Sequence, residues 1–199
     1  MCTRADICQA FWPDLSTAQA VNVFHVTKRR LHKALGYDVV AHDGNHYQAN
    51  PDLNIRYDVM EFVSSLVDAR TKEGSEAEPL WQHAIDMYRG HYLHGHDDPW
   101  IVTRRADFLE GYLEALAALA RIRDDQGKPE NALSLLLRAL NDAYNREDLH
   151  REVLRLYGKL GRRAEAADHY QKLEHEFRER YSIEPAPETQ TVYRQAVGS

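Results

Sequence analysis

The sequence is poor in several features that define common protein classes. Its 199 residues include two cysteines, Cys2 and Cys8, too few for a disulfide framework or for a four-ligand zinc site of their own. No stretch approaches the roughly 18 consecutive apolar residues of a membrane-spanning helix. The N-terminal residues, with an acid at Asp6, have no apolar segment of signal-peptide length. We therefore expect a cytoplasmic protein without a membrane partner.

Patterns for common catalytic chemistry are also missing. Neither GxxxxGK[ST] nor GxGxxG occurs, so the usual phosphate-binding loops are absent. No nucleophile stands beside a base at a spacing typical of covalent catalysis. Hydrophobic residues make up 43% and charged residues 28% of the chain, an ordinary balance for a folded protein. We predict a folded protein that is not an enzyme, with no cofactor and no catalytic residues.

Positive charge is scarce overall but concentrated. The net charge is -6, to which residues 1–57 contribute +1 and the remaining residues -7. Most of the basic residues of this first segment lie close together, at Lys28, Arg29, Arg30 and Lys33. An acidic chain can still bind nucleic acid through a local basic surface. The charge pattern confines such a site to the first quarter of the sequence.

Residues 1–57 have the pattern of two helices followed by a hairpin. A short helix over residues 3–11 is expected to stop before Pro13, since proline disfavours helical backbone in the residue that precedes it. Residues 16–19, Ser-Thr-Ala-Gln, form a capping-box pattern that opens a second helix. That helix is expected to end at Gly36, a residue type common just after helix ends.

The hairpin is expected from two β-prone runs, residues 38–42 and 46–49. The Asp43-Gly44-Asn45 sequence joins them, and Asp-Gly between such runs is a strong short-range hairpin signal. At the tip, His46 is the one residue that can carry positive charge.

The rest of the chain is expected to be all-α. Apolar residues recur at helical spacing, and a last short helix is expected after Pro187. The helical stretches are residues 59–67, 80–88, 100–122, 132–144, 149–160 and 164–177.

A repeat is visible in this region. Gly127 and Gly161 are 34 residues apart, as are Ala132 and Ala166, and 34 is the tetratricopeptide period. Residues 84–88 resemble a third, degenerate unit that an insertion of 14 residues separates from the second. An irregular helical bundle is the alternative.

The basic helix has two faces when its residues are placed at about 100° intervals. One face is an apolar stripe expected to lie in the core: Ala20, Val23, Phe24, Thr27, Leu31, Ala34 and Leu35. The opposite face mixes an amide, an aliphatic residue and cations: Asn22, His25, Val26, Arg29 and Lys33.

Such a mixture suits a recognition helix in the DNA major groove. Arg29 can pair with guanine, Asn22 with adenine, and Val26 can contact a thymine methyl group. Lys28 and Arg30 flank the apolar stripe and suit phosphates. Two helices and a hairpin wing together indicate a winged helix-turn-helix, with His46 as a weak wing contact. A solvated cationic face without a ligand is the alternative.

At this point the chain resembles a known family. Residues 18–36, AQAVNVFHVTKRRLHKALG, with Phe-Trp-Pro at 11–13 and Gly-Asn-His-Tyr at 44–47, resemble an OmpR/PhoB-type winged helix. The form is that of the SARP (antibiotic regulatory protein) family and related large bacterial activators. The later region resembles the bacterial transcriptional activator domain through a series of short motifs, at residues 57–62, 88–90, 100–105, 112–116, 150–157, 161–170 and 184–189.

The resemblance implies a mainly α protein with two domains. Residues 1–56 correspond to a partial winged helix-turn-helix that begins at the second helix of the family's fold, and residues 57–199 correspond to the tetratricopeptide-like activator domain. It also implies a DNA-binding transcriptional regulator whose partners are promoter DNA, RNA polymerase, an upstream sensor or ATPase module of the same polypeptide, and a second copy of the chain.

The departure from the family's pattern leads to a second hypothesis. Without the family's first helix, Phe24, Leu31 and Leu35 are expected to be exposed, and burying each is typically worth about 1.5–3 kcal/mol. The alternative function is therefore a helical-repeat interaction or dimerisation module without autonomous DNA binding.

Histidines suggest one more hypothesis. The His94-x-His96-x-Asp98 pattern resembles part of a metallohydrolase motif, since zinc favours imidazole and carboxylate ligands. Pro99 replaces the last ligand, and Asp98-Pro99 also reads as the start of a helix. We predict a polar loop without a catalytic metal, and an adventitious or structural metal remains the alternative. His150 and His169 are expected to be surface or packing residues.

Overall fold

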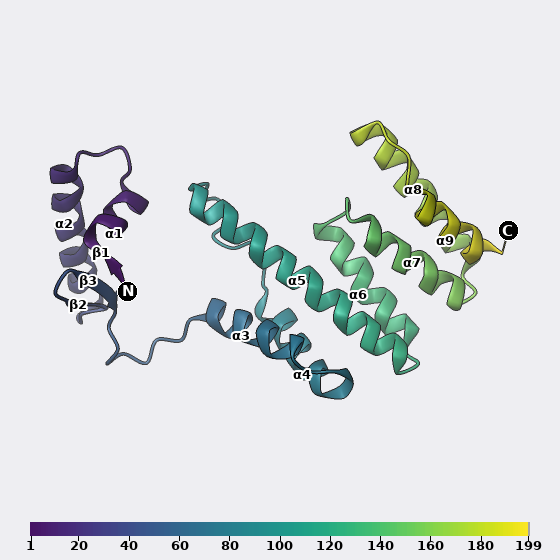
Figure 1. Cartoon of the computed structure of the whole chain (residues 1–199), viewed down its shortest axis with the longest axis horizontal. Helices are drawn as coiled ribbons and strands as arrows, with labels where there is room; N and C mark the ends of the chain where they lie inside the picture. The colour runs from purple at the N-terminus through teal and green to yellow at the C-terminus, as the bar shows by residue number, and fades with distance from the viewer. Residues whose placement is uncertain (199) are drawn as a thin grey trace. The chain divides into compact units, whose positions relative to one another are not determined.

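The computed structural model describes residues 1–198, which divide into two compact units (Figure 1). Unit 1 is Met1–Arg56 and unit 2 begins at Tyr57. No helix in the described residues is long and apolar enough to cross a membrane.

Unit 1 contains two helices and a small antiparallel sheet. Its elements are β1 (Cys2–Thr3), α1 (Arg4–Phe11), α2 (Thr17–Leu35), β2 (Val40–Asp43) and β3 (His46–Ala49). The sheet order is β1-β3-β2, with Cys2 opposite Tyr47 and Thr3 opposite His46. The predicted helices and hairpin are confirmed. The strand β1 was not expected, because two residues are too few to show a periodic pattern.

Local hydrogen bonds fix where these elements start and stop. In α1, the Thr3 hydroxyl accepts from the Asp6 backbone N–H, and the Thr3 backbone N–H donates to the Asp6 carboxylate at 2.8 Å. This last bond lowers the pKa of Asp6. In α2, the side-chain oxygen of Gln19 accepts from the Ser16 backbone N–H at 3.1 Å, and Gly36 ends the helix at φ 82°.

The core of unit 1 is small and covers only part of α2. Its buried residues are Cys8, Ala20, Phe24 and Tyr47, and the rings of Phe24 and Tyr47 meet edge to face at 5.0 Å. The expectation that Phe24 is exposed was wrong, because Tyr47 of β3 covers it.

The C-terminal half of the predicted core stripe is exposed, which corrects the sequence-based assignment. Thr27, Leu31, Ala34 and Leu35 are all exposed, with Leu31 at 38% and Leu35 at 44%. The eight residues of α1 and the four-residue strands of the hairpin are too short to cover all 19 residues of α2.

Unit 2 is a succession of antiparallel helices, each packed against the next (Figure 1). The last helix packs against the two before it. The helices are α3 (Asp58–Arg70), α4 (Gly74–Met87), α5 (Pro99–Asp125), α6 (Pro129–Asp142), α7 (Glu147–Lys159), α8 (Arg163–Tyr181) and α9 (Pro187–Val197).

The predicted repeat is confirmed at the α5–α6 and α7–α8 turns. Gly127 and Gly161 have φ of 73° and 69°, a backbone conformation that glycine adopts at little cost. The Lys128 N–H donates to the Arg123 carbonyl at 2.8 Å, and 34 residues later the Arg162 N–H donates to the Tyr157 carbonyl at 2.9 Å. The same turn therefore occurs twice, and the helices form repeats rather than an irregular bundle.

The start of α4 differs from the prediction. Gly74 was expected in a turn and the helix near residue 80, but α4 begins at Gly74 and contains Pro79. Ala77, Trp81 and Ala84 of this helix are buried. Their packing outweighs the hydrogen bond that proline removes, a case in which tertiary contacts override local propensity.

The two helical histidines form a buried pair between α7 and α8. His150 is fully buried, its Nε2 lies 2.8 Å from the Tyr144 carbonyl oxygen, and its Nδ1 lies 2.9 Å from His169 Nε2. A carbonyl only accepts, so His150 Nε2 donates to it and His169 Nε2 donates to His150 Nδ1. Burial lowers the pKa of His150 and lowers that of His169 to about 4.

Candidate nucleic-acid interface

The residues predicted to face DNA bases form one exposed strip along α2. Asn22, His25, Val26, Arg29 and Lys33 are all exposed. Their spacing of three and four residues places them on one side of the helix. The buried residues Ala20 and Phe24 lie on the other side. The core therefore orients the strip outward.

The flanking cations differ in their surroundings. Arg30 is exposed, whereas Lys28 is half-buried and its Nζ lies 5.8 Å from the centre of the Tyr47 ring. A cation in this position is attracted to the ring by roughly 0.5–1 kcal/mol. The contact draws Lys28 toward β3.

The wing residue His46 does not join the α2 strip. Neighbouring residues of a strand point to opposite faces of the sheet, and Tyr47 is the residue that packs on Phe24. His46 is exposed on the other face, where it contributes to the lowered pKa of Asp6 in α1, after the larger effect of hydrogen bonding from Thr3.

The cations of the strip are not neutralised by carboxylates of the described residues. The ion pair nearest to them joins His32 to Asp38 at 3.0 Å. Within residues 1–198, no ion pair or side-chain hydrogen bond involves Arg29, Arg30 or Lys33. Their positive charge is therefore available to an anionic ligand such as a phosphate backbone.

Sequence reasoning missed one cation near the wing. Arg4 opens α1 next to Thr3, which pairs with His46 across the sheet. Arg4, His42 and Asn45 help to line a cavity of about 710 Å³ where α1, the start of α2 and the hairpin meet. No sequence signal identified Arg4, because its position beside the hairpin follows from the pairing of β1.

The histidine loop between α4 and α5 contains no metal-ligand cluster. His91, His94 and His96 are exposed. Among residues 1–198, no three His, Cys, Asp or Glu side chains gather closely enough to hold a metal ion.

Arg105 of α5 holds this loop. Its Nε donates to the Tyr92 carbonyl at 2.9 Å, and its Nη2 donates to the carbonyls of Leu93 and His96. Asp98 and Pro99 occupy the N-cap and first position of α5, as predicted.

Comparison with known proteins gives one curated relative and one solved structure. The chain is 26% identical over 191 residues to Regulatory protein AfsR of Streptomyces coelicolor, which covers 93% of this chain and 19% of AfsR. EmbR of Mycobacterium tuberculosis, solved in complex with a low affinity phosphopeptide, superposes with a TM-score of 0.75 at 19% identity, over 99% of this chain and 55% of that one.

These likenesses differ in what they establish. The similarity to EmbR shows a shared fold. The chain spans about a fifth of AfsR and about half of the EmbR chain. Residues 58–196 match the family model of the bacterial transcriptional activator domain, which is well over half of the sequence. The chain therefore belongs to the bacterial transcriptional activator domain family, a family of transcriptional regulators.

Proposed function

We propose that this chain reads promoter DNA through unit 1 and binds protein partners through unit 2. In this proposal residues 1–56 are a partial winged helix-turn-helix and residues 57–199 are the activator domain. The carrying observation is the exposed strip of α2, whose cations have no carboxylate partner among the described residues. The function is recognition in the cytoplasm, without a catalytic step or a cofactor.

The residues of α2 have distinct roles in this proposal. Arg29 pairs with a guanine edge, Asn22 with adenine, and Val26 contacts a thymine methyl group. His25 and Lys33 complete the strip. The flanking cations, with the exposed His46, contact backbone phosphates and position the helix without reading sequence: Lys28 and Arg30.

Protein partners follow from the family and not from a visible contact. RNA polymerase is the partner class expected of an activator. The length of AfsR relative to this chain supports a sensor or ATPase module elsewhere in the same polypeptide. A second copy of the chain is a further candidate.

A specific observation favours a second function, an interaction module that does not bind DNA alone. Leu31 and Leu35 are exposed in the half of α2 that carries Arg29 and Lys33. A helix end without packing on its apolar side is less firmly held. The end of the recognition strip is then poorly positioned to read bases.

Selection of random duplex DNA by the whole chain, at two salt concentrations, separates these functions. DNA reading predicts enrichment of one motif. Arg29→Ala should then cost about 1–3 kcal/mol and relax preference at one base position. Lys28→Ala should weaken all sequences alike and reduce the salt slope by about one. Arg178→Ala, a cation of α8, is the control and should change neither.

Two results would contradict DNA reading. One is weak, salt-sensitive binding with no enriched motif, which would support the interaction module. The other is full affinity of the Arg29 and Lys28 variants for a selected site, which would show that another surface contacts DNA.

A further inference from the structure

A groove of about 390 Å³ lies between α5 and α7, with Leu136 of α6 contributing to its lining. Small residues of α5, Ala117 and Ala120, form part of its wall. Five charged side chains also line it: Arg121, Asp148, Arg151, Glu152 and Arg155.

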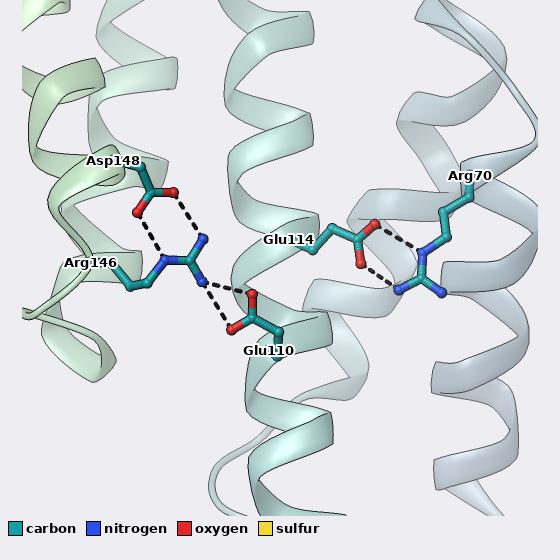
Figure 2. Close-up of polar contacts among 5 residues, drawn as sticks. All are labelled: Arg70, Glu110, Glu114, Arg146 and Asp148. Carbon is teal, nitrogen blue, oxygen red and sulfur yellow. Dashed lines mark hydrogen bonds and ion pairs between the residues drawn. The ribbon is translucent and has the colours of Figure 1, made fainter.

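The carboxylates along this side of α5 are already bound by arginines from neighbouring helices. Figure 2 shows Arg70 of α3 bound to Glu114, and Arg146 bound to Glu110. The Arg70 Nε lies 2.9 Å from Glu114 Oε1, and the Arg146 Nη1 lies 2.7 Å from Glu110 Oε1. Arg146 also donates twice to Asp148, which lines the groove (Figure 2). These contacts neutralise one end.

The carboxylates at the other end are bound in the same way. Asp124 of α5 is buried and accepts from Lys159 at 2.6 Å and from Arg155 at 3.0 Å. Burial by itself raises the pKa of Asp124, but the bonds from Lys159 and Arg155 outweigh it and lower the pKa below its usual value. Arg155 also donates to Glu152 at 2.9 Å. Each acid that lines the groove thus has a basic partner.

Two arginines of the groove have no carboxylate partner. In the part of the chain that the structure describes, Arg121 makes no ion pair or side-chain hydrogen bond, even with Asp125 one turn away. Arg151 donates to the hydroxyl of Thr189 in α9 at 3.2 Å, a contact that leaves its charge uncompensated. The groove therefore has surplus positive charge inside an acidic unit.

We propose that this groove binds an acidic segment of a partner protein, whose carboxylates pair with Arg121 and Arg151. Arginine forms two parallel hydrogen bonds with a carboxylate, and the small side chains of Ala117 and Ala120 let a peptide backbone approach. Stacked helical repeats commonly bind extended segments on such surfaces. This inference goes beyond DNA reading and does not depend on it.

The charge of the surrounding unit favours a peptide over DNA at this site. Residues 58–199 have a net charge of -7. A duplex would bring a long row of phosphates against that acidic surface, whereas a short peptide reaches only the local arginines.

Fluorescence anisotropy with the whole chain and a fluorescein-labelled (Glu-Ala)6 peptide tests the proposal, with (Gln-Ala)6 as the uncharged counterpart. The Glu peptide should bind about tenfold more tightly, as expected for one to two charge-assisted hydrogen bonds. The double variant Arg121→Gln/Arg151→Gln should abolish this preference. Arg180→Gln, an exposed cation of α8, is the matched control and should retain it.

A second variant keeps both arginines and guards against a folding artefact. Ala117→Glu, at a half-buried position one turn before Arg121, offers the groove an internal carboxylate. It should weaken the Glu peptide while circular dichroism and the unfolding temperature show an intact fold.

Three results would overturn the proposal. The first is equal affinity for the two peptides, and the second is full affinity of the double variant. The third is competition by a duplex DNA probe that requires Arg121 and Arg151, which would assign the groove to nucleic acid. Arg29→Ala should leave peptide binding unchanged, so failure of DNA reading and failure of this proposal give different outcomes.

Discussion

The two units bury their longest helices to different extents. In unit 1, α2 has 19 residues and buries Ala20 and Phe24. In unit 2, α5 has 27 residues and buries ten of them, because α3, α4 and α6 all pack against it. An amphipathic pattern thus identifies the face that a helix can bury, but the neighbouring elements decide how much of that face is covered.

This difference predicts unequal stability. Small units bury a low fraction of their surface and are marginally stable, and the core of unit 1 has four buried hydrophobic residues. Unit 2 has a continuous core along its stacked helices. The following predictions test this contrast, from the largest expected effect to the smallest.

Truncation of one central residue in each unit should have opposite outcomes. Phe24→Ala should cost about 3–5 kcal/mol, enough to unfold unit 1, since so few other residues hold it together. Leu116→Ala, at a fully buried position of α5, should cost about 2–5 kcal/mol and leave unit 2 folded. Urea unfolding followed by NMR signals of each unit measures both effects. Retention of unit 1 signals in Phe24→Ala would show that its core is larger than Phe24 and its contacts.

The buried histidine pair should make unit 2 sensitive to mild acid. The pKa of His169 is lowered to about 4, so the unfolded chain binds a proton near pH 6.5 that the folded chain does not. Stability is therefore complete above pH 6.5, falls as the pH drops toward 4, and loses no more from this group below that. The loss is at most about 3 kcal/mol.

His169→Gln isolates this contribution. Glutamine retains an N–H donor for His150 Nδ1 but does not titrate, so the stability of the variant should fall less between pH 6.5 and 4. Urea titrations at several pH values measure the difference. An unchanged pH profile would show that other groups cause the acid sensitivity.

Two glycines of unit 2 should respond differently to a methyl group. A Cβ at Gly158 of α7 would lie 2.9 Å from the backbone Cα of Ala196 in α9, so Gly158→Ala should cost about 1–3 kcal/mol by displacing α9. At Gly111 of α5 the close atom is the tip of the Leu66 side chain, at 2.6 Å. That side chain can rotate, so Gly111→Ala should cost less. Thermal unfolding and proteolysis near α9 compare them, and equal losses would contradict the distinction.

The exposed leucines of α2 should be replaceable at almost no cost. Leu31→Gln/Leu35→Gln should change the free energy of unfolding by less than about 0.5 kcal/mol per residue, as at other surface positions. Leu154→Ala in unit 2, at a fully buried position, is the contrasting variant and should cost about 2–5 kcal/mol. A loss above 2 kcal/mol in the double variant would show that the leucines are covered in solution.

Much of the fold follows from short sequence patterns. The capping residues around α2, Ser16 and Gly36, and the repeated glycines at 127 and 161 lie where predicted. The exposure of Asn22 and Arg29 also follows from their position opposite Phe24. Each of these features depends on residues within one or two helical turns, so the sequence by itself determined them.

Other features depend on residues far apart in the chain, and only the tertiary structure decided them. The pairing of β1 with β3, the packing of Phe24 on Tyr47 and the exposure of Leu31 all depend on which segments meet in space. The surplus charge of Arg121 appears only once the surrounding carboxylates are seen bound to other helices. Local patterns describe what a side chain can do, and the packing of distant segments determines which partners are left for it.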